Sequence, residues 1–304
     1  MSSCATQQRL IEAGLIIDYH DLGDMTRGHV SIRMPDDPEH FYMKPHSFGF
    51  DEITPENMVI CNMQGEKVGG TGRKHSEVYI HSEIYKARPE VNSVIHAHPT
   101  YAVAFSATGQ HLQPVSQPSV AFSDGLPYFD EAIDLIRTPA LGVGVATALG
   151  KSKAVLMRNH GVTVVGSSVE ETTILLIMLE NACQIQLAAM SAGVGATFDA
   201  AQIQKLHHDI TRPEQYTINF DYLIRKIKRL NQQGTIVDEL EAVEVTTGKP
   251  KEVEPNFVDV VGQISLRSLE KNDRRRKDQQ RNANNGPRNF NGLRDNNGHR
   301  DNSG

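Results

Sequence analysis

The segment HSEVYIHSEIYKARPEVNSVIHAHP, residues 75–99, holds a helix pattern followed directly by a strand pattern. Residues 76–88 are good helix formers, with Ser76 as the predicted N-cap and a proline just beyond the end. Residues 91–98 form an apolar run that stops at Pro99, which is typical of a buried strand. The segment predicts a helix that packs beside a strand, as in an α/β fold.

Two histidines lie at the end of this strand. Alternate residues of a strand face the same side of a sheet, so we expect His96 and His98 to project together. Two neutral imidazoles at this spacing are able to bind one metal ion. The alternative is a pair of buried core histidines that found hydrogen-bond partners, and the pair alone does not decide between the two.

Glu77 stands at the start of the preceding helix. That helix should be roughly 18 Å long, and the strand after it should rise roughly 20–23 Å. If the strand returns antiparallel to the helix, Glu77 comes close to His96 and His98. The alternative is a carboxylate that complements the helix dipole. His81, one turn further along, is interpreted as a structural or supporting residue.

A third histidine follows another apolar strand, in AVLMRNHGVTVVG at residues 154–166. His160 ends this strand and Gly161 leaves room beside it; the alternative is a turn histidine that bonds the backbone. Three imidazoles and Glu77 would make a divalent-cation site with an open position. Such an ion is a Lewis acid, and a carboxylate beside it could move a proton, which suits making or quenching an enolate.

The remaining chain alternates between strands and helices without an internal repeat. We expect a catalytic domain over residues 1–230, an extension over 231–270, and an Asn- and Arg-rich tail over 271–304 that is disordered because it has little to bury. The predicted helices are 5–20, 98–109, short pieces in 129–150, 168–193 as the longest, and 214–232. The predicted strands are 27–35, 40–45, 58–70 with a turn, and two within 153–168.

Composition narrows the class of protein. The net charge of the 304 residues is −6, and the only basic excess lies in the tail. The charge pattern therefore predicts no nucleic-acid binding. The three cysteines have no metal or disulfide spacing, and no signal peptide or membrane span is expected. We expect a cytoplasmic protein that acts on a small molecule.

Together these motifs resemble the class II aldolase/adducin family. The resemblance covers roughly residues 5–210 and is carried by GHVSIR (28–33), the 75–99 segment, RNHG (158–161) and the long helix that follows. It implies a single α/β domain with a largely antiparallel central sheet flanked by helices. It also implies a homotetramer with active sites at subunit interfaces.

The resemblance further assigns roles to the site residues. His96, His98 and His160 would bind the metal, most commonly zinc, with iron, manganese or cobalt as alternatives. Glu77 would be the general acid/base and would also touch the free metal.

The expected substrate pocket departs from the sugar-phosphate members of the family. His29 stands where they have a phosphate-binding Asn, and His75-Ser76 replaces their paired serines. KPHSFGF (44–50) keeps Lys44 but loses the small turn, and LQPVSQPSV (112–120) offers Gln117 where the fuculose-phosphate enzyme has a proton-donating tyrosine. A non-phosphorylated substrate is therefore expected. The predicted substrate contacts are His29, Ser31, Lys44, His75, Ser76 and Gln117.

The predicted function is a metal-dependent carbon–carbon lyase, an aldolase or a decarboxylase, acting through a metal-stabilised enolate on a small hydroxy or oxo acid. Two alternatives stay open. One is a non-haem iron oxygenase acting on a hydroxyphenylpyruvate-like substrate. The other is a catalytically silent, adducin-like interaction protein, although adducin heads lack the full ligand set that this chain keeps.

Overall fold

The computed structural model describes the backbone of residues 3–193 and 195–245, and the side chains of this range as far as residue 232. The chain is divided after Ala242, and its first unit, Met1–Ala242, is compact. The sheet and the candidate site belong to the first unit. The tail predicted over 271–304 and most of the extension predicted over 231–270 lie outside the described residues.

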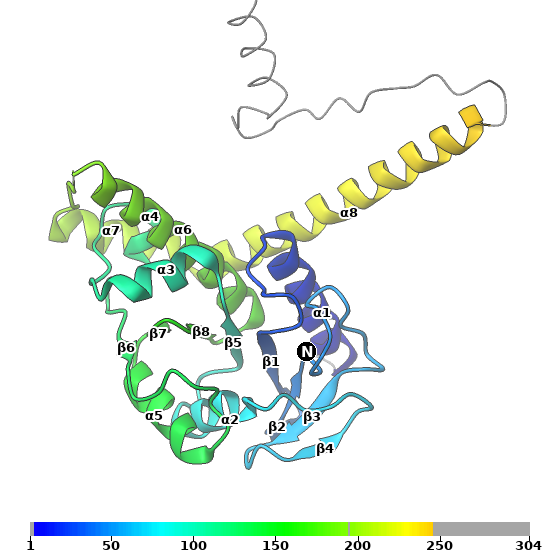
Figure 1. Ribbon diagram of the computed structural model, residues 1–304, viewed down its shortest axis with the longest axis horizontal. Coiled ribbons are helices and arrows are strands. Elements are labelled where there is room, and N and C mark those ends of the chain that lie inside the picture. The colour runs from blue at the N-terminus through cyan, green and yellow to red at the C-terminus, as the bar shows by residue number, and fades with distance from the viewer. Residues whose placement is uncertain (1–2, 194, 246–304) are drawn as a thin grey trace, which may run out of the picture. The chain divides into compact units, whose positions relative to one another are not determined.

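One eight-stranded sheet forms the centre of the first unit (Figure 1). Its strand order is β4-β3-β2-β1-β5-β8-β7-β6, and every neighbouring pair is antiparallel except β6 and β7. The strands are β1 (His29–Met34), β2 (Asp37–Met43), β3 (Val59–Asn62), β4 (Lys67–Gly69), β5 (Ser93–Ala97), β6 (Tyr128–Phe129), β7 (Ala154–Met157) and β8 (Gly161–Gly166).

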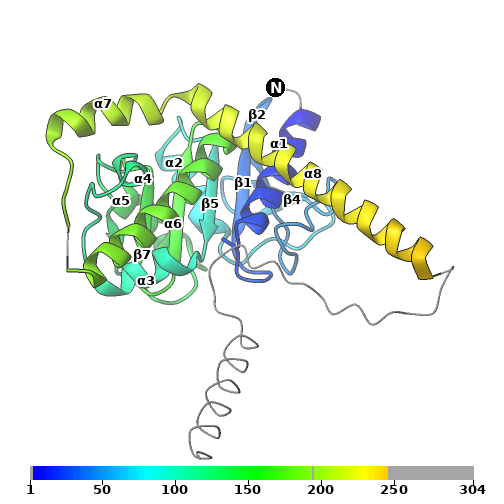
Figure 2. The same ribbon diagram turned by 90° about the horizontal axis from the view of Figure 1, so that it is seen from above.

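Helices cover both faces of the sheet (Figures 1 and 2). One face carries α1, α3, α6 and the first part of α8, and the other carries α2 and α5. Helix α4 packs on α6 and α7. The helices are α1 (Ser3–Tyr19), α2 (Val78–Ala87), α3 (Thr100–Thr108), α4 (Gln117–Val120), α5 (Pro139–Leu149), α6 (Val169–Ser191), α7 (Ala200–Ile210) and α8 (Pro213–Val245).

The sheet separates two apolar cores because successive residues of a strand face opposite sides. In β5, Ile95 and Ala97 face the core under α1 and α6, whereas Val94 faces the core under α2 and α5. In β1, Val30 and Ile32 belong to the α6 side. On the α2 side, His29 and Ser31 of β1 and His96 of β5 are polar, and they build the candidate site.

The fold class predicted from the sequence is confirmed, with corrections in detail. Ser76 is not the N-cap of α2: the helix begins after Glu77, whose side chain makes no cap hydrogen bond because it turns toward the histidines. Among the described residues, the longest helix is α8 rather than the one predicted over 168–193, and it continues past residue 232 to Val245. The sequence patterns also missed β6, α4 and α7.

Helix α6 is the one described helix that is long and apolar enough, by length and composition alone, to cross a membrane. Its buried side chains pack on β5, β8, α1 and α3. The apolar character of α6 therefore reflects its place as the central helix of one core.

Candidate metal centre

The register of three adjacent strands builds the floor of the site. His29 of β1 lies opposite His96 of β5, and His96 lies opposite Thr163 of β8. Residues opposite each other in a sheet share a face, so the three side chains form one row on the α2 side. All three are fully buried. The ring centroids of His29 and His96 are 5.0 Å apart, and His96 Nδ1 lies 3.3 Å from the Thr163 hydroxyl.

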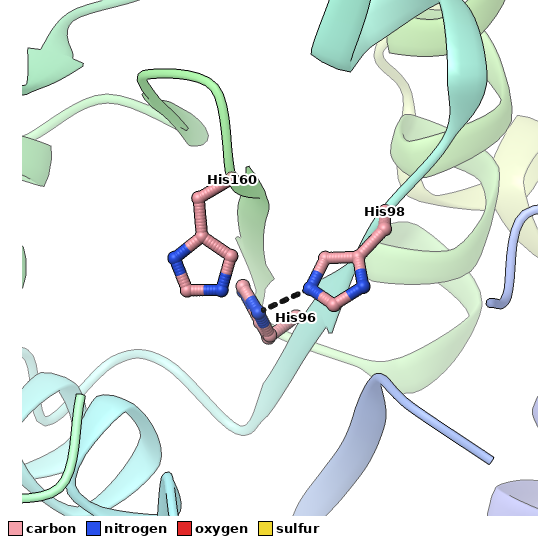
Figure 3. Close-up of side chains that lie close together, drawn as sticks. All are labelled: His96, His98 and His160. Carbon is pink, nitrogen blue, oxygen red and sulfur yellow. Dashed lines mark hydrogen bonds between the residues drawn. The ribbon is translucent and has the colours of Figure 1, made fainter. Parts of the chain in front are cut away.

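His98 and His160 stand at the rim above His96 (Figure 3). His98 lies just beyond β5, and His160 ends the turn between β7 and β8, in which Asn159 has φ +57°. The His96 and His98 Nε2 atoms face each other at 3.1 Å. The His160 ring lies 5.0 Å from that of His96 and 5.3 Å from that of His98, centroid to centroid. The three imidazoles converge although they come from two separate parts of the chain.

Two local features hold His98 in place. The carboxylate of Glu180, from α6, accepts hydrogen bonds from the Tyr101 and Ala102 N–H groups, which anchors the helix that begins just after His98. Gly161 permits the close approach of the two rim loops, since a Cβ there would lie 2.5 Å from His98 Cδ2 and 2.6 Å from the Ala97 carbonyl oxygen. A glycine after His160 is therefore a geometric requirement of the cluster.

The Glu77 carboxylate lies among these imidazoles. Its Oε2 is 3.6 Å from His29 Nε2 and 3.9 Å from His96 Nε2, and its Oε1 is 3.8 Å from His160 Nε2. The Ile136 N–H donates a 2.8 Å hydrogen bond to Oε1, which fixes the carboxylate. The sequence predicted the approach of Glu77 to His96; its other imidazole neighbours are His29 and His160 rather than His98.

Burial sets the protonation of the cluster. Burial raises the pKa of Glu77 above its ordinary value, against the Ile136 N–H and a neighbouring arginine charge that lower it. Burial and adjacent imidazoles hold the pKa of His29 and of His96 well below the usual range, and lower the pKa of His160 to about 4. The imidazoles are therefore neutral near pH 7, which is the state in which histidine binds a metal.

Two predicted substrate contacts, His29 and Ser31, belong to a buried chain of hydrogen bonds beneath the cluster. His29 Nδ1 lies 2.6 Å from His81 Nε2, and His81 Nδ1 lies 2.6 Å from the Ser31 hydroxyl, which reaches the Tyr85 hydroxyl at 2.7 Å. Ser31 is fully buried in this chain of hydrogen bonds. The same chain holds His81 in the structural position that the sequence suggested.

Lys44 is also fully buried. Its ammonium donates to the backbone carbonyls of Thr26 and Pro45 and lies 5.3 Å from the Phe50 ring centroid. Burial lowers the pKa of Lys44 to about 8. The cation therefore already has partners within the fold.

The remaining predicted substrate contacts are His75, Ser76 and Gln117, and they do not all lie near the cluster. The His75 ring lies tilted against the His29 ring with centroids 4.0 Å apart, and its Nδ1 is buried without a hydrogen-bond partner. Ser76 is half-buried between His75 and Glu77. Gln117 is exposed at the start of α4 and lines a separate cavity of about 250 Å³ with residues of α6 and α8. The structure thus brings His75, but not Gln117, to the histidine cluster.

Three supporting groups were missed from the sequence. Thr163 bonds His96, the Ile136 N–H bonds Glu77, and Asp24 lies 3.4 Å from His98 Nδ1. The alternation of residues in β8 could have placed Thr163 on a polar face. Asp24 and Ile136 lie in irregular segments, where no sequence period indicates which way a group points.

The side chains fit a divalent cation. Two ligands about 2.0–2.1 Å from a tetrahedral ion are roughly 3.3 Å apart, close to the 3.1 Å between the His96 and His98 Nε2 atoms. Both nitrogens of His160 and Nε2 of His29 are buried without hydrogen-bond partners. Such orphaned atoms are costly in a protein interior unless a ligand satisfies them. His96, His98 and His160 form one candidate ligand set, and His29, Glu77 and His96 form another.

Comparison with known proteins identifies the family of the chain. Residues 8–187 match the family model described as Class II Aldolase and Adducin N-terminal domain, and the chain belongs to this family. A solved L-fuculose 1-phosphate aldolase from Glaciozyma antarctica PI12 is 29% identical, with a TM-score of 0.66 over 75% of this chain and 90% of that chain. Class II aldolases depend on a divalent metal, and the histidine and glutamate cluster is the candidate site for it here.

Of three curated relatives, two are named for different enzymatic activities. The meiotically up-regulated gene 14 protein of Schizosaccharomyces pombe is 38% identical over 55% of this chain and 66% of its own length. The 4-hydroxy-3-prenylphenylpyruvate oxygenase/4-hydroxy-3-prenylbenzoate synthase of Streptomyces roseochromogenus is 31% identical over 60% of this chain and 66% of its own length. Decarboxylase NovR of Streptomyces niveus is 31% identical over 56% of this chain and 64% of its own length. The matches therefore span just under two thirds of each relative.

Proposed function

We propose that this protein is a divalent-metal-dependent carbon–carbon lyase, an aldolase or a decarboxylase, that acts on a small non-phosphorylated hydroxy or oxo acid. The observation that carries the proposal is the buried Glu77 carboxylate, which lies 3.6–3.9 Å from imidazole nitrogens of three histidines. A neutral-ligand metal set beside one carboxylate supplies the two functions that such chemistry needs, a Lewis acid and a proton carrier.

His96, His98 and His160 would hold the metal, with zinc favoured by three neutral nitrogen ligands and iron, manganese or cobalt as alternatives. When bound, the ion supplies Lewis-acid stabilisation of negative charge that develops on a neighbouring substrate oxygen. Glu77 would move the proton, because its carboxylate is fixed by the Ile136 N–H and directed into the cluster.

The substrate class follows from the groups that surround the cluster. His29, Ser31, Lys44, His75 and Ser76 are the proposed substrate contacts, whereas Gln117 lines a separate cavity and is not proposed again. The His75 Nδ1 atom has no partner, whereas Lys44 is already bonded to two carbonyls. A single carboxylate or hydroxyl suits these donors better than a doubly charged phosphate. Similarity to a decarboxylase supports a carboxylic acid as the substrate.

A second candidate function is oxidation by non-haem iron. The set of His29, Glu77 and His96 has the two imidazoles and one carboxylate that such iron sites use. Similarity to a prenylphenylpyruvate oxygenase supports the same alternative. An adducin-like, catalytically silent role is less well supported, because the described chain keeps Glu77 and all three predicted metal ligands.

The setting of the enzyme is also a proposal. We propose a cytoplasmic homotetramer with no membrane or nucleic-acid partner, in which residues 1–230 carry catalysis and residues 271–304 are dispensable. Removal of residues 271–304 should leave turnover unchanged, and an inactive truncated protein would contradict the proposed division.

A substrate screen tests the proposed function. The full-length protein, loaded with zinc or with ferrous iron, should be incubated with hydroxy acids and oxo acids, with and without oxygen. A lyase releases carbon dioxide or an aldehyde in the absence of oxygen. Turnover that requires oxygen uptake would replace the lyase with the oxygenase. Absence of any reaction with a protein that holds its metal would favour the interaction role.

A further inference from the structure

His29 and His96 form a deeper layer of the histidine cluster than His98 and His160. The two residues are cross-strand partners in β1 and β5, and neither exposes any surface. His98 and His160 lie on loops at the strand ends and are partly exposed. We call His29, Glu77 and His96 the inner set, and His96, His98 and His160 the outer set.

The inner set has the spacing of metal ligands. The Glu77 Oε2 atom is 3.6 Å from His29 Nε2 and 3.9 Å from His96 Nε2, and all three ligand atoms lie within 4.8 Å of one another. Ligand atoms about 2.1 Å from one ion lie roughly 3.0–3.4 Å apart when adjacent. Side-chain shifts of several tenths of an ångström to about an ångström would bring the inner set to coordination distance.

In both inner histidines, His29 and His96, the Nδ1 atom faces a hydrogen-bonding group, which leaves Nε2 for a metal. A ligating histidine usually donates its other N–H to a fixed partner, which sets the tautomer and the ring orientation. His29 Nδ1 faces His81 Nε2 at 2.6 Å, and His96 Nδ1 faces the Thr163 hydroxyl at 3.3 Å. Both nitrogens of His160, in the outer set, lack such a partner. By this criterion His29 is better prepared to bind a metal than His160.

The His81 contact also explains which His29 nitrogen is free. With Nδ1 engaged by His81, the Nε2 atom faces Glu77 and has no hydrogen-bond partner within the fold. The supporting contacts continue from His81 through Ser31 to Tyr85, all fully buried or nearly so. A chain of this length fixes His29 rigidly, and a buried imidazole nitrogen without a partner is satisfied by a cation.

The two sets share His96 Nε2, which has one lone pair and binds one ion at a time. We propose that the site holds a single ion in either of two positions, an outer position on three imidazoles and an inner position on His29, Glu77 and His96. The inner set supplies a negative charge and matches the two-histidine, one-carboxylate arrangement of ferrous sites, whereas the outer set matches zinc. The inference rests on the proposed metal centre and adds His29 to its ligands.

Metal binding to variants separates the two positions. Wild type, H29Q, H98A/H160A and H29Q/H98A/H160A should be titrated anaerobically with ferrous iron and separately with zinc, with binding followed by equilibrium dialysis. H98A/H160A should keep one ferrous ion per chain, and the triple variant should lose it. H29Q should keep zinc, with iron affinity reduced ~10-fold or more. H40Q, at a half-buried histidine of β2 that belongs to neither ligand set, serves as the control and should bind both metals as wild type does.

The outcomes distinguish this inference from the proposed function. A folded H98A/H160A that binds neither metal, beside a wild type that binds one ion, overturns the inner position and leaves the proposed lyase intact. A wild type that binds no ion overturns the proposed function itself. If H98A/H160A does not fold, anomalous scattering from wild-type crystals grown with iron decides the question. Iron within bonding distance of His29 supports the inner position, and iron that contacts only His98 and His160 besides His96 overturns it.

Discussion

The two faces of the central sheet are built from the same strands but perform different tasks. On the side of α6, Val30 of β1 and Ile95 of β5 are fully buried among apolar side chains. On the side of α2, the neighbouring positions of the same strands are His29 and His96. Because a strand alternates faces, one sequence supplies a continuous apolar core and a row of polar groups. Stability and chemistry should therefore be separable by mutation.

The largest effect is expected for E77Q on the polar face. Glutamine keeps the shape of the side chain and an oxygen that accepts the Ile136 N–H hydrogen bond. It cannot carry the proton, so turnover of the substrate found in the screen should fall by about 100- to 10,000-fold. Zinc content and melting temperature should stay near the wild-type values. The exposed E56Q is the matched control, and equal turnover in both variants would remove Glu77 from the chemistry.

The next largest effect is expected for I95A on the apolar face. Removal of this buried side chain should lower the free energy of unfolding by about 2–5 kcal/mol, measured by urea denaturation. Zinc bound per folded chain should not change, because Ile95 points away from the cluster.

T163V is the counterpart of I95A on the polar face. It should cost little stability but weaken metal affinity by roughly 10-fold, since it removes the partner of His96. If the two variants lost metal equally, the faces would not be separable.

The polar face could be predicted only in part. His96, His98 and His160 follow from histidines at strand ends, and Glu77 follows from the comparable lengths of a helix and the strand after it. The pairing of His29 with His96 depends on the register between β1 and β5, which are about sixty residues apart in the chain. Register between distant strands is set by tertiary packing, so no local period of the sequence reveals it.

On the apolar face, the long buried helix was easy to predict from the sequence, whereas short or exposed elements were not. The buried character of α6 is visible as apolar residues on most faces of one long pattern. Helix α7 has no buried residue, and β6 has two residues, so neither gives a strong hydrophobic period.

The wrong N-cap assignment for Ser76 has a physical reason as well. Glu77 is held by the cluster and by Ile136, which overrides the local preference for a serine cap.

A smaller effect is expected for G161A at the rim between the two faces. The added Cβ would lie 2.5 Å from His98 Cδ2 and 2.6 Å from the Ala97 carbonyl oxygen, so the rim loops must separate. We expect a loss of about 1–3 kcal/mol in unfolding free energy, together with weaker zinc binding in a competition assay. G195A has no atom within 4 Å of its Cβ and should change neither quantity. Unchanged zinc affinity in G161A would show that the rim is not the metal site.

The smallest effect is expected for K153M at the border of the apolar face. Burial alone would raise the pKa of Glu171, but hydrogen bonds from Lys153 and Ser167 reverse this and hold it below its usual value. A depressed pKa stabilises the fold at neutral pH, and this contribution disappears as the pH falls through the folded-state pKa. K153M should therefore lower stability by about 1 kcal/mol or less at pH 7 and by almost nothing near pH ~3. A difference that persisted in acid would contradict the ion-pair explanation.

The most direct test of the metal centre is the metal content of the purified full-length protein. His96 belongs to both candidate ligand sets, so a H96A/H98A variant removes the shared ligand and its nearest neighbour. Wild type should contain about one divalent ion per chain, and the variant should contain none while remaining folded. H207A/H208A, which changes the half-buried His207 and the exposed His208 of α7, controls for nonspecific binding and should keep the ion. Full metal retention in H96A/H98A would contradict the assignment of the histidine cluster as the metal site.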